Sequence, residues 1–123
     1  MSATSTLKPI EMDLDTWKTS LELELARFVE LVINRFDPQR IILFGSLAQD
    51  NPKVWSDIDV IVIRETDARF IDRGLEIRSA FHPRVGMDIL VYTPEEFEHL
   101  CVERIFFRQE ILEKGKVLYE QRY

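Results

Sequence analysis

Two short apolar runs joined by a polar segment constrain the fold of this chain more than any other feature. The first run, Ile41–Phe44, ends at Gly45-Ser46. Ten residues later, Asp57-Ile58-Asp59 opens the second run, Val60–Ile63. Both runs are rich in β-branched residues, are too short for ordinary helices and are bounded by turn-forming residues. The pattern predicts two strands that are apolar on both faces and lie inside a covered sheet.

The two aspartates at the start of the second run form the main candidate site. Because side chains alternate along a strand, Asp57 and Asp59 are expected to face the same way, with Ile58 on the other side. Their attachment points would lie roughly 6.5–7 Å apart, a spacing that suits carboxylates converging on a pair of metal ions. Two carboxylates repel by roughly 4 kcal/mol at about 4 Å when the effective dielectric is about 20. A cation is therefore expected beside them, and oxygen ligands near phosphate chemistry favour magnesium.

The Gly45-Ser46 turn supplies the other half of this candidate site. Glycine lets the backbone turn sharply and approach a ligand closely. Ser46 is predicted to be the N-cap of a short helix over residues 47–50, whose free N–H groups would face a phosphate. A serine hydroxyl and open backbone donors opposite a carboxylate pair predict a triphosphate-binding site.

A third strand brings in another carboxylate. Residues 86–92 are predicted to form this strand, with Asp88 on the same face as Leu90 and Tyr92. An ionised carboxylate on a strand built for burial is unfavourable unless it is compensated. Asp88 would be compensated by a salt bridge, by a position at the strand end or by a role in the site. With Asp57 and Asp59 already in place, the site role is the favoured interpretation.

The remaining chain is expected to form three longer helices and a last extended piece. Capping residues and prolines place the first helix from Asp13 or Asp15 to residue 36 and the second from Thr66 or Asp67 to residue 81. The third is expected to start at Thr93, with Pro94 at the first position and Glu96 completing a capping box, and to end at residue 114. Residues 116–120 are expected to be extended. The predicted inward residues are Leu14, Trp17, Leu21, Leu25, Phe28, Val29, Val32 and Phe36 in the first helix, Phe70, Ile71, Leu75, Arg78 and Phe81 in the second, and Phe97, Leu100, Cys101, Ile105, Ile111 and Leu112 in the third.

Four other residues have both an ordinary and a functional interpretation. Trp17 fits a core position better than a base-stacking role, and Cys101 fits a small core residue better than a nucleophile. His82 and Arg84 fit a solvated loop better than an acceptor-binding or phosphate-binding role. The ordinary interpretation is favoured for all four.

The length, net charge and cysteine content of the chain limit the class of protein that it can be. At 123 residues the chain is expected to be one domain over residues 1–123, with a flexible segment at 1–12. Its formal net charge of −6 argues against nucleic acid as the main partner. A single cysteine fits a reducing compartment, and the sequence shows neither a membrane-spanning run nor a secretory signal, so a cytoplasmic location is expected.

Gly45-Ser46 followed by Asp57-Ile58-Asp59 resembles the signature of the DNA polymerase β-like nucleotidyltransferase superfamily, and the small size of the chain resembles its minimal nucleotidyltransferases (MNT). The resemblance implies an α+β fold in which helices flank a small mixed sheet. It implies that Asp57, Asp59 and Asp88 are catalytic residues that bind two Mg²⁺ ions. It also implies that Gly45 and Ser46 bind the β- and γ-phosphates of ATP or another nucleoside triphosphate.

The same resemblance implies a function and a partner. MNT proteins commonly act as antitoxins of HEPN-type toxins, some by transferring AMP from ATP to a hydroxyl of the toxin. The chain is too short after about residue 113 for an added acceptor domain, so the acceptor would come from a HEPN-type partner, another copy in a homo-oligomer or a large substrate. The apolar residues Phe106, Phe107 and Tyr119 are candidates for a partner surface, with at least one of the two phenylalanines expected in the core.

One departure from the family pattern keeps a second function open. Where family members often continue with a basic residue and then Ala-Arg-Gly, this chain has Leu47, Ala48, Gln49 and Asp50. The alternative is therefore a non-catalytic antitoxin or binding module that neutralises its partner by contact. An Asp-x-Asp phosphatase is a weaker alternative, because it explains neither Gly45-Ser46 nor the ten-residue spacing.

Overall fold

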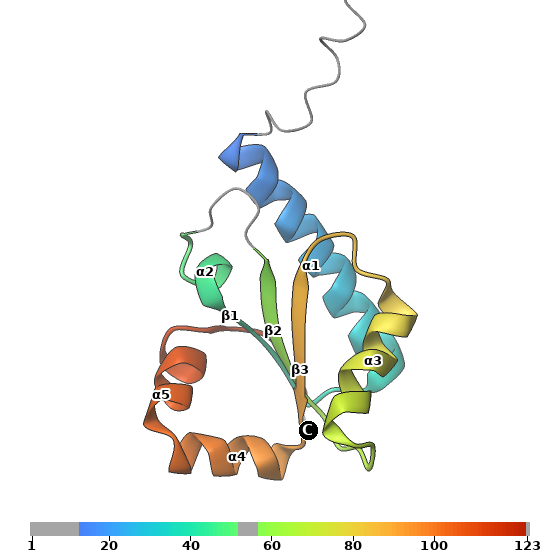
Figure 1. Cartoon of the computed structure of the whole chain (residues 1–123), viewed down its shortest axis with the longest axis vertical. Coiled ribbons are helices and arrows are strands. Elements are labelled where there is room, and N and C mark those ends of the chain that lie inside the picture. The colour runs from blue at the N-terminus through green and yellow to red at the C-terminus, as the bar shows by residue number, and fades with distance from the viewer. Residues whose placement is uncertain (1–12, 52–56, 123) are drawn as a thin grey trace, which may run out of the picture.

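A four-stranded mixed sheet organises the chain in the computed structural model, which describes residues 13–51 and 57–122 (Figure 1). The elements are α1 (Leu14–Phe36), β1 (Arg40–Phe44), the short helix α2 (Gly45–Ala48), β2 (Ile58–Ile63), α3 (Phe70–Phe81), β3 (Met87–Tyr92), α4 (Pro94–Glu103), α5 (Ile105–Arg108), the π-helical turn η3 (Gln109–Glu113) and β4 (Lys116–Glu120). The strand order is β3-β2-β1-β4; β2 and β3 are parallel, and β1 is antiparallel to both β2 and β4. The predicted α+β fold, with a small mixed sheet between helices, is confirmed.

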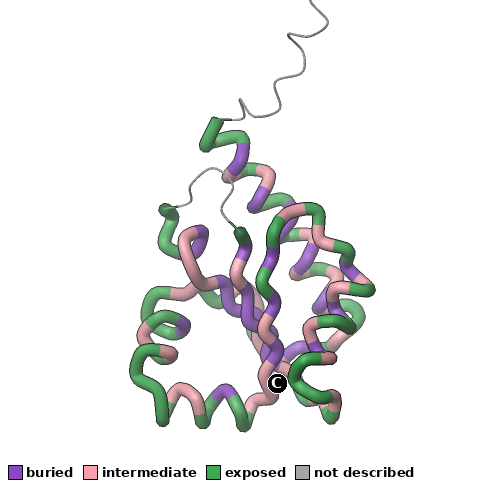
Figure 2. The backbone as a smooth tube through the Cα atoms, viewed as in Figure 1, coloured by how far each residue is buried: buried purple, intermediate pink, exposed green. Residues whose placement is uncertain are grey.

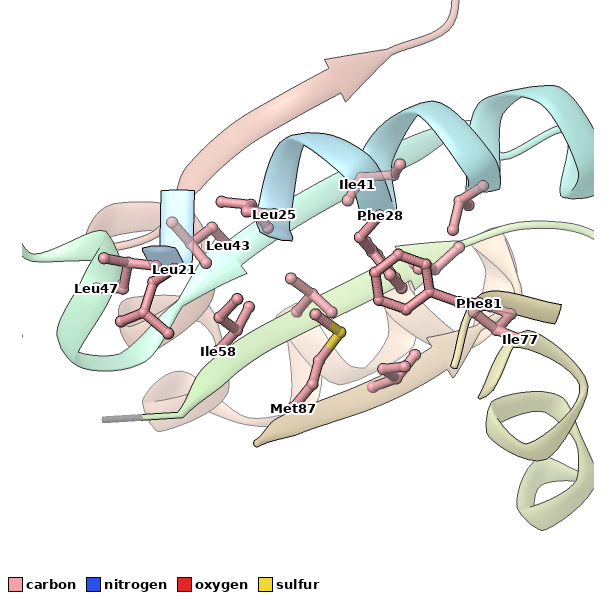
Figure 3. Close-up of a cluster of buried hydrophobic side chains, with 14 of the residues drawn as sticks. Leu21, Leu25, Phe28, Ile41, Leu43, Leu47, Ile58, Ile77, Phe81 and Met87 are labelled. Carbon is pink, nitrogen blue, oxygen red and sulfur yellow. The ribbon is translucent and has the colours of Figure 1, made fainter. Parts of the chain in front are cut away.

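The larger core lies between one face of the sheet and the helices α1 and α3. Figure 3 shows Leu21, Leu25 and Phe28 of α1 above the strands, and Phe28 meets Phe81 of α3 edge to face with ring centroids 5.2 Å apart. Trp17 is buried in the same cluster, which confirms its interpretation as a core residue. Burying a large apolar side chain contributes about 1.5–3 kcal/mol, so this cluster fixes how α1 and α3 sit on the sheet.

The opposite face of the sheet carries a smaller core. Its fully buried members are Ile42, Ile61, Ile63, Phe97 and Ile111. Half-buried residues of α4 and α5, Cys101 among them, pack against this cluster. Figure 2 shows that the central strands are mainly buried, whereas α4 and α5 are mainly exposed or half-buried. This face is therefore covered less completely than the α1 face.

Several element boundaries agree with the sequence predictions. The Asp13 side chain caps α1 by accepting a hydrogen bond from the Thr16 N–H at 2.7 Å. Thr93 and Glu96 form the predicted capping box at the start of α4, with Pro94 as its first residue. The side chains of β3 alternate as expected, and residues 116–120 form β4. No helix in the described ranges is long and apolar enough to cross a membrane.

The second long helix differs from its prediction in both its start and its buried face. It begins at Phe70, and no side chain caps it; Thr66 instead accepts a hydrogen bond from the Ala68 N–H at 3.1 Å. Phe70, Ile71 and Leu75 are exposed, which contradicts the predicted inward face. The buried residues of α3 are Arg73, Ile77 and Phe81, of which only Phe81 was predicted to be inward.

The predicted single helix over residues 93–114 is also wrong in part. Arg104 has an extended backbone, with φ −127° and ψ 100°, which ends α4 and lets α5 run in a new direction (Figure 1). The turn brings the Phe107 ring against Tyr92 and Phe97. Ile105 and Leu112, both predicted to be inward, are instead 56% and 42% exposed.

A buried ion pair fixes the loop that leads into β3. Glu24 of α1 is only 6% exposed and accepts hydrogen bonds from Arg27 at 2.9 Å and from the Arg84 backbone N–H at 2.6 Å. Arg27 also donates to the carbonyls of Phe81 and His82 at 3.2 and 3.1 Å. Two side chains of α1 thus hold residues 81–84 by their backbone, a few residues before Asp88.

We expect Glu24→Gln to lower the free energy of unfolding by about 2–4 kcal/mol, because it removes a buried charge that accepts several hydrogen bonds. Arg27 holds the pKa of Glu24 below its ordinary value of 4.5, so this stabilisation is present above that pH and is lost in more acidic solution. Urea unfolding at pH 7 and at lower pH measures the effect. Glu22→Gln, at an exposed position of the same helix, is the control; an equal loss in both variants would contradict the role of the ion pair.

Candidate active site at one end of the sheet

Two carboxyl groups meet at the end of the sheet where β2 and β3 begin. Asp59 and Asp88 are register partners in these parallel strands, and their side chains share a hydrogen bond. Both lie on the face of the smaller core, because Asp59 alternates with the buried Val60 and Asp88 with the buried Met87 and Ile89. The strand pairing therefore places the two groups together.

The environment of Asp59 opposes its ionisation. Burial, the hydrogen bond to Asp88 and the negative charges of Asp88 and Asp57 together raise its pKa to about 6. Without a cation, the pair is held together by a proton at acidic pH and repels at neutral pH. The group that best relieves this repulsion is a positive ion.

Asp57 lies one residue before β2 and is exposed. Its carboxylate packs over Gly86, where an added Cβ would come within 2.1 Å of the Asp57 Oδ1. The Ile58 N–H donates to the Gly86 carbonyl at 2.9 Å, so the two backbones are already joined at this point. A glycine at position 86 therefore leaves the space that the Asp57 side chain occupies.

Gly45 makes the corresponding space for Asp59. A Cβ at this position would lie 2.3 Å from the Asp59 Oδ2, and the φ of +77° falls in the region that favours glycine. Phe44, the preceding residue, is the register partner of Asp59 across β1 and β2. The turn after β1 is thus directly beside the carboxyl pair.

The predicted N-cap role of Ser46 is wrong. The short helix α2 starts at Gly45, its cap residue is Phe44, and no side chain caps it. The extended backbone of Phe44, with φ −135°, takes the cap position because the helix follows β1 without an intervening residue. Ser46 lies inside this helical turn and is half-buried, and its carbonyl accepts a hydrogen bond from the Asn51 N–H at 3.0 Å.

One residue near the turn was missed by the sequence analysis. Lys18 of α1 forms an ion pair with Asp50, which has a positive φ of 54°. The sequence pattern placed Lys18 off the apolar stripe of its helix, but nothing in the pattern placed it over the Gly45-Ser46 turn. The negative charge of Asp50 is therefore balanced from a distant part of the chain.

The carboxyl groups have the donor chemistry that magnesium prefers. Asp59 and Asp88 present oxygen atoms side by side, and Asp57 is near enough to affect the ionisation of Asp59. Within residues 13–51 and 57–122, no three His, Cys, Asp or Glu side chains converge closely enough to hold a metal ion. The arrangement fits a cation held first by the Asp59–Asp88 pair.

Solved structures share this fold. A protein from Sulfolobus solfataricus described as a putative nucleotidyltransferase matches with a TM-score of 0.62 and 19% identity, over 85% of this chain and 84% of that chain. A toxin–antitoxin structure with AMP-PNP matches with a TM-score of 0.51 and 21% identity, over 79% of this chain and 73% of that one. A mutant of the toxin–antitoxin complex MntA–HpeT matches with a TM-score of 0.53 and 22% identity, over 80% of this chain and 73% of that one.

Sequence comparison gives the family. No curated protein matches the chain. The family described as "Polymerase beta, Nucleotidyltransferase" matches residues 27–123, a range that includes every strand and all of the candidate site. The chain therefore belongs to the polymerase β nucleotidyltransferase family.

Proposed function

We propose that this chain is a magnesium-dependent nucleotidyltransferase that moves AMP from ATP to a hydroxyl group of a partner protein. The observation that carries the proposal is the Asp59–Asp88 pair beside the glycine turn after β1. Membership of the family supports the reaction class. The arrangement offers carboxylates for a cation next to backbone that can approach a phosphate closely.

Each residue of the site has a proposed role. Asp59, Asp88 and Asp57 would hold two Mg²⁺ ions. When bound, magnesium neutralises charge on the triphosphate and stabilises the attacking and leaving oxygens. Gly45 and Ser46 would bind the β- and γ-phosphates.

The proposed reaction is a substitution at the α-phosphorus. The hydroxyl oxygen of the acceptor forms a bond to this phosphorus while the bond to the bridging oxygen breaks, and pyrophosphate leaves. Asp88, the more exposed of the two paired aspartates, accepts the proton of the hydroxyl.

The structural neighbours support a toxin as the proposed partner of this chain. Two of them come from toxin–antitoxin complexes, and one of these was solved with AMP-PNP. We propose that this chain is likewise the antitoxin of a pair and that its acceptor is a HEPN-type toxin. Because AMP-PNP is an analogue of ATP, we propose ATP as the nucleotide substrate of this chain.

The composition of the Gly45-Ser46 turn favours a second candidate function. Positions 47–50 contribute no positive side chain, and Lys18, the cation beside the turn, is already paired with Asp50. A turn that binds triphosphate weakly would suit a module that neutralises its partner by contact alone.

A transfer assay separates the two functions. With labelled ATP, Mg²⁺ and the product of the neighbouring gene as acceptor, we expect Asp59→Asn to reduce label transfer at least about 100-fold, because it removes a charged ligand from the carboxyl pair. Asp67→Asn, in an exposed loop, should leave transfer unchanged. Equal neutralisation of the partner by wild type and Asp59→Asn, with no label in either case, would favour the binding module instead.

The same substitution has an expected effect on stability. Because the pKa of Asp59 is raised from 3.8 to about 6, the folded state binds more protons than the unfolded chain in this range, and wild-type stability falls as the pH rises through it. Without metal, we therefore expect Asp59→Asn to be more stable than wild type by about 1–3 kcal/mol at pH 8 and by much less at pH 4. Urea unfolding in EDTA measures this difference. A variant that is less stable than wild type at pH 8 would show that the pair does not repel.

A further inference from the structure

An apolar surface runs over α3, α4 and α5 on the outside of the molecule. Three of its large side chains are about half exposed or more and line two adjoining hollows: Phe70 (49%), Ile105 (56%) and Phe106 (80%). Single exposed apolar residues are ordinary, but a contiguous group of large ones marks an interaction site. We call the surface formed by Phe70, Tyr92, Leu100, Ile105 and Phe106 the α3–α5 surface.

Two adjoining hollows join the parts of this surface. The first, of about 610 Å³, lies between Phe70, Tyr92 and Leu100. The second, of about 630 Å³, is lined by Ile105 and Phe106 and shares Leu100 with the first. Tyr92 lies between the two hollows. Its ring centroid is 5.4 Å from that of Phe70, which lines the first hollow, and 5.8 Å from that of Phe107, which lines the second. The surface is therefore one groove with two depressions, a shape that suits the successive anchor residues of a helix.

The helix beside this groove is strongly acidic. α4 contains Glu95, Glu96, Glu98 and Glu103 and no lysine or arginine. Glu96 is paired with Arg73, with 2.6 Å between the charged atoms. Glu95 lines the first hollow, and Glu103 lines the second together with Arg104. Neither glutamate forms an ion pair with any residue in the described ranges, so their charge can attract a positively charged partner.

The groove lies on the same side of the sheet as the carboxyl pair. Tyr92 and Asp88 belong to β3, lie four positions apart and share a face of the strand. At a rise of about 3.3 Å per residue, the groove begins roughly 13 Å from the site. A protein bound in the groove would therefore bring its neighbouring side chains to the carboxylates.

We propose that the α3–α5 surface binds an amphipathic helix of the partner protein, whose apolar residues enter the two hollows and whose lysines or arginines lie beside the α4 glutamates. The inference rests on the proposed function, because the bound helix belongs to the protein that carries the acceptor hydroxyl. Phe106 and Phe70 are the main apolar contacts, and Glu95 and Glu103 are the main charged ones.

A defined peptide tests this surface without knowledge of the natural partner. The probe is a fluorescein-labelled peptide of about 18 residues, with leucines at helical spacing on one face and lysines on the other, measured by fluorescence anisotropy with the full chain. We expect saturable binding, weakened about tenfold by Phe106→Ser or Phe70→Ser. Leu23→Ser is the matched control, because Leu23 is 68% exposed on α1, which covers the opposite face of the sheet.

A second pair of variants tests the charge. We expect the double variant Glu95→Gln and Glu103→Gln to bind the peptide about fivefold more weakly and with less dependence on salt. The double variant Glu22→Gln and Glu30→Gln removes two exposed charges from α1 and should bind like wild type. Equal losses in both double variants would mean that net charge alone attracts the peptide, and would overturn the proposal.

Three other results would also overturn it. These are no binding of the peptide, equal binding of a scrambled peptide of the same composition, and sedimentation that shows a wild-type dimer made monomeric by Phe106→Ser. The last result would mean that a second copy covers the groove. Calorimetry with Mg²⁺ and ATP on the wild type and the same variants distinguishes this proposal from the proposed reaction. If none of these proteins gives a heat of ATP binding, the proposed reaction is contradicted. The peptide-binding result still decides whether the α3–α5 surface is a docking surface.

Discussion

The repulsion between Asp59 and Asp88 is the constraint around which the rest of the site is arranged. Parallel pairing of β2 with β3 places the two residues at the same level, and neither side chain can move away without leaving the face that its strand gives it. Such a pair needs a shared proton or a cation. The fold therefore maintains a site whose preferred occupant is positively charged, and it does so by backbone pairing rather than by flexible side chains.

The rest of the fold keeps the two strands in this register. The larger core holds α1 and α3 on the opposite face, and Glu24 with Arg27 fixes the loop before β3 by its backbone. Gly45 and Gly86 then leave room for the carboxylates, because a side chain at either position would overlap them. The repulsion is thus opposed by interactions on the other side of the sheet, away from the site.

The sequence was sufficient for features that depend on local pattern and insufficient for those that depend on distant pairing. Alternation predicted the strands and the face of Asp88, and capping residues predicted the start of α4. The buried face of α3 was wrong because Arg73 takes the inward position, where it is satisfied by Glu96 and by the Val91 carbonyl, 23 and 18 residues away. Neither partner is visible from the periodicity of α3 alone.

The inward position of Arg73 explains why this small domain has an exposed apolar surface. In the Arg73–Glu96 pair, Arg73 is 8% exposed and Glu96 is 44% exposed, and such a partly buried pair is generally no more stabilising than apolar residues of the same volume. With Arg73 directed inward, Phe70 and Ile71 are turned outward, and the pairing with Glu96 ties the start of α3 to α4. An apolar residue at position 73 would fill the core equally well but would leave the two helices unconnected. The Arg73–Glu96 pair therefore does more for the shape of the outer groove than for the stability of the core, and it links that groove to the strand that carries Asp88.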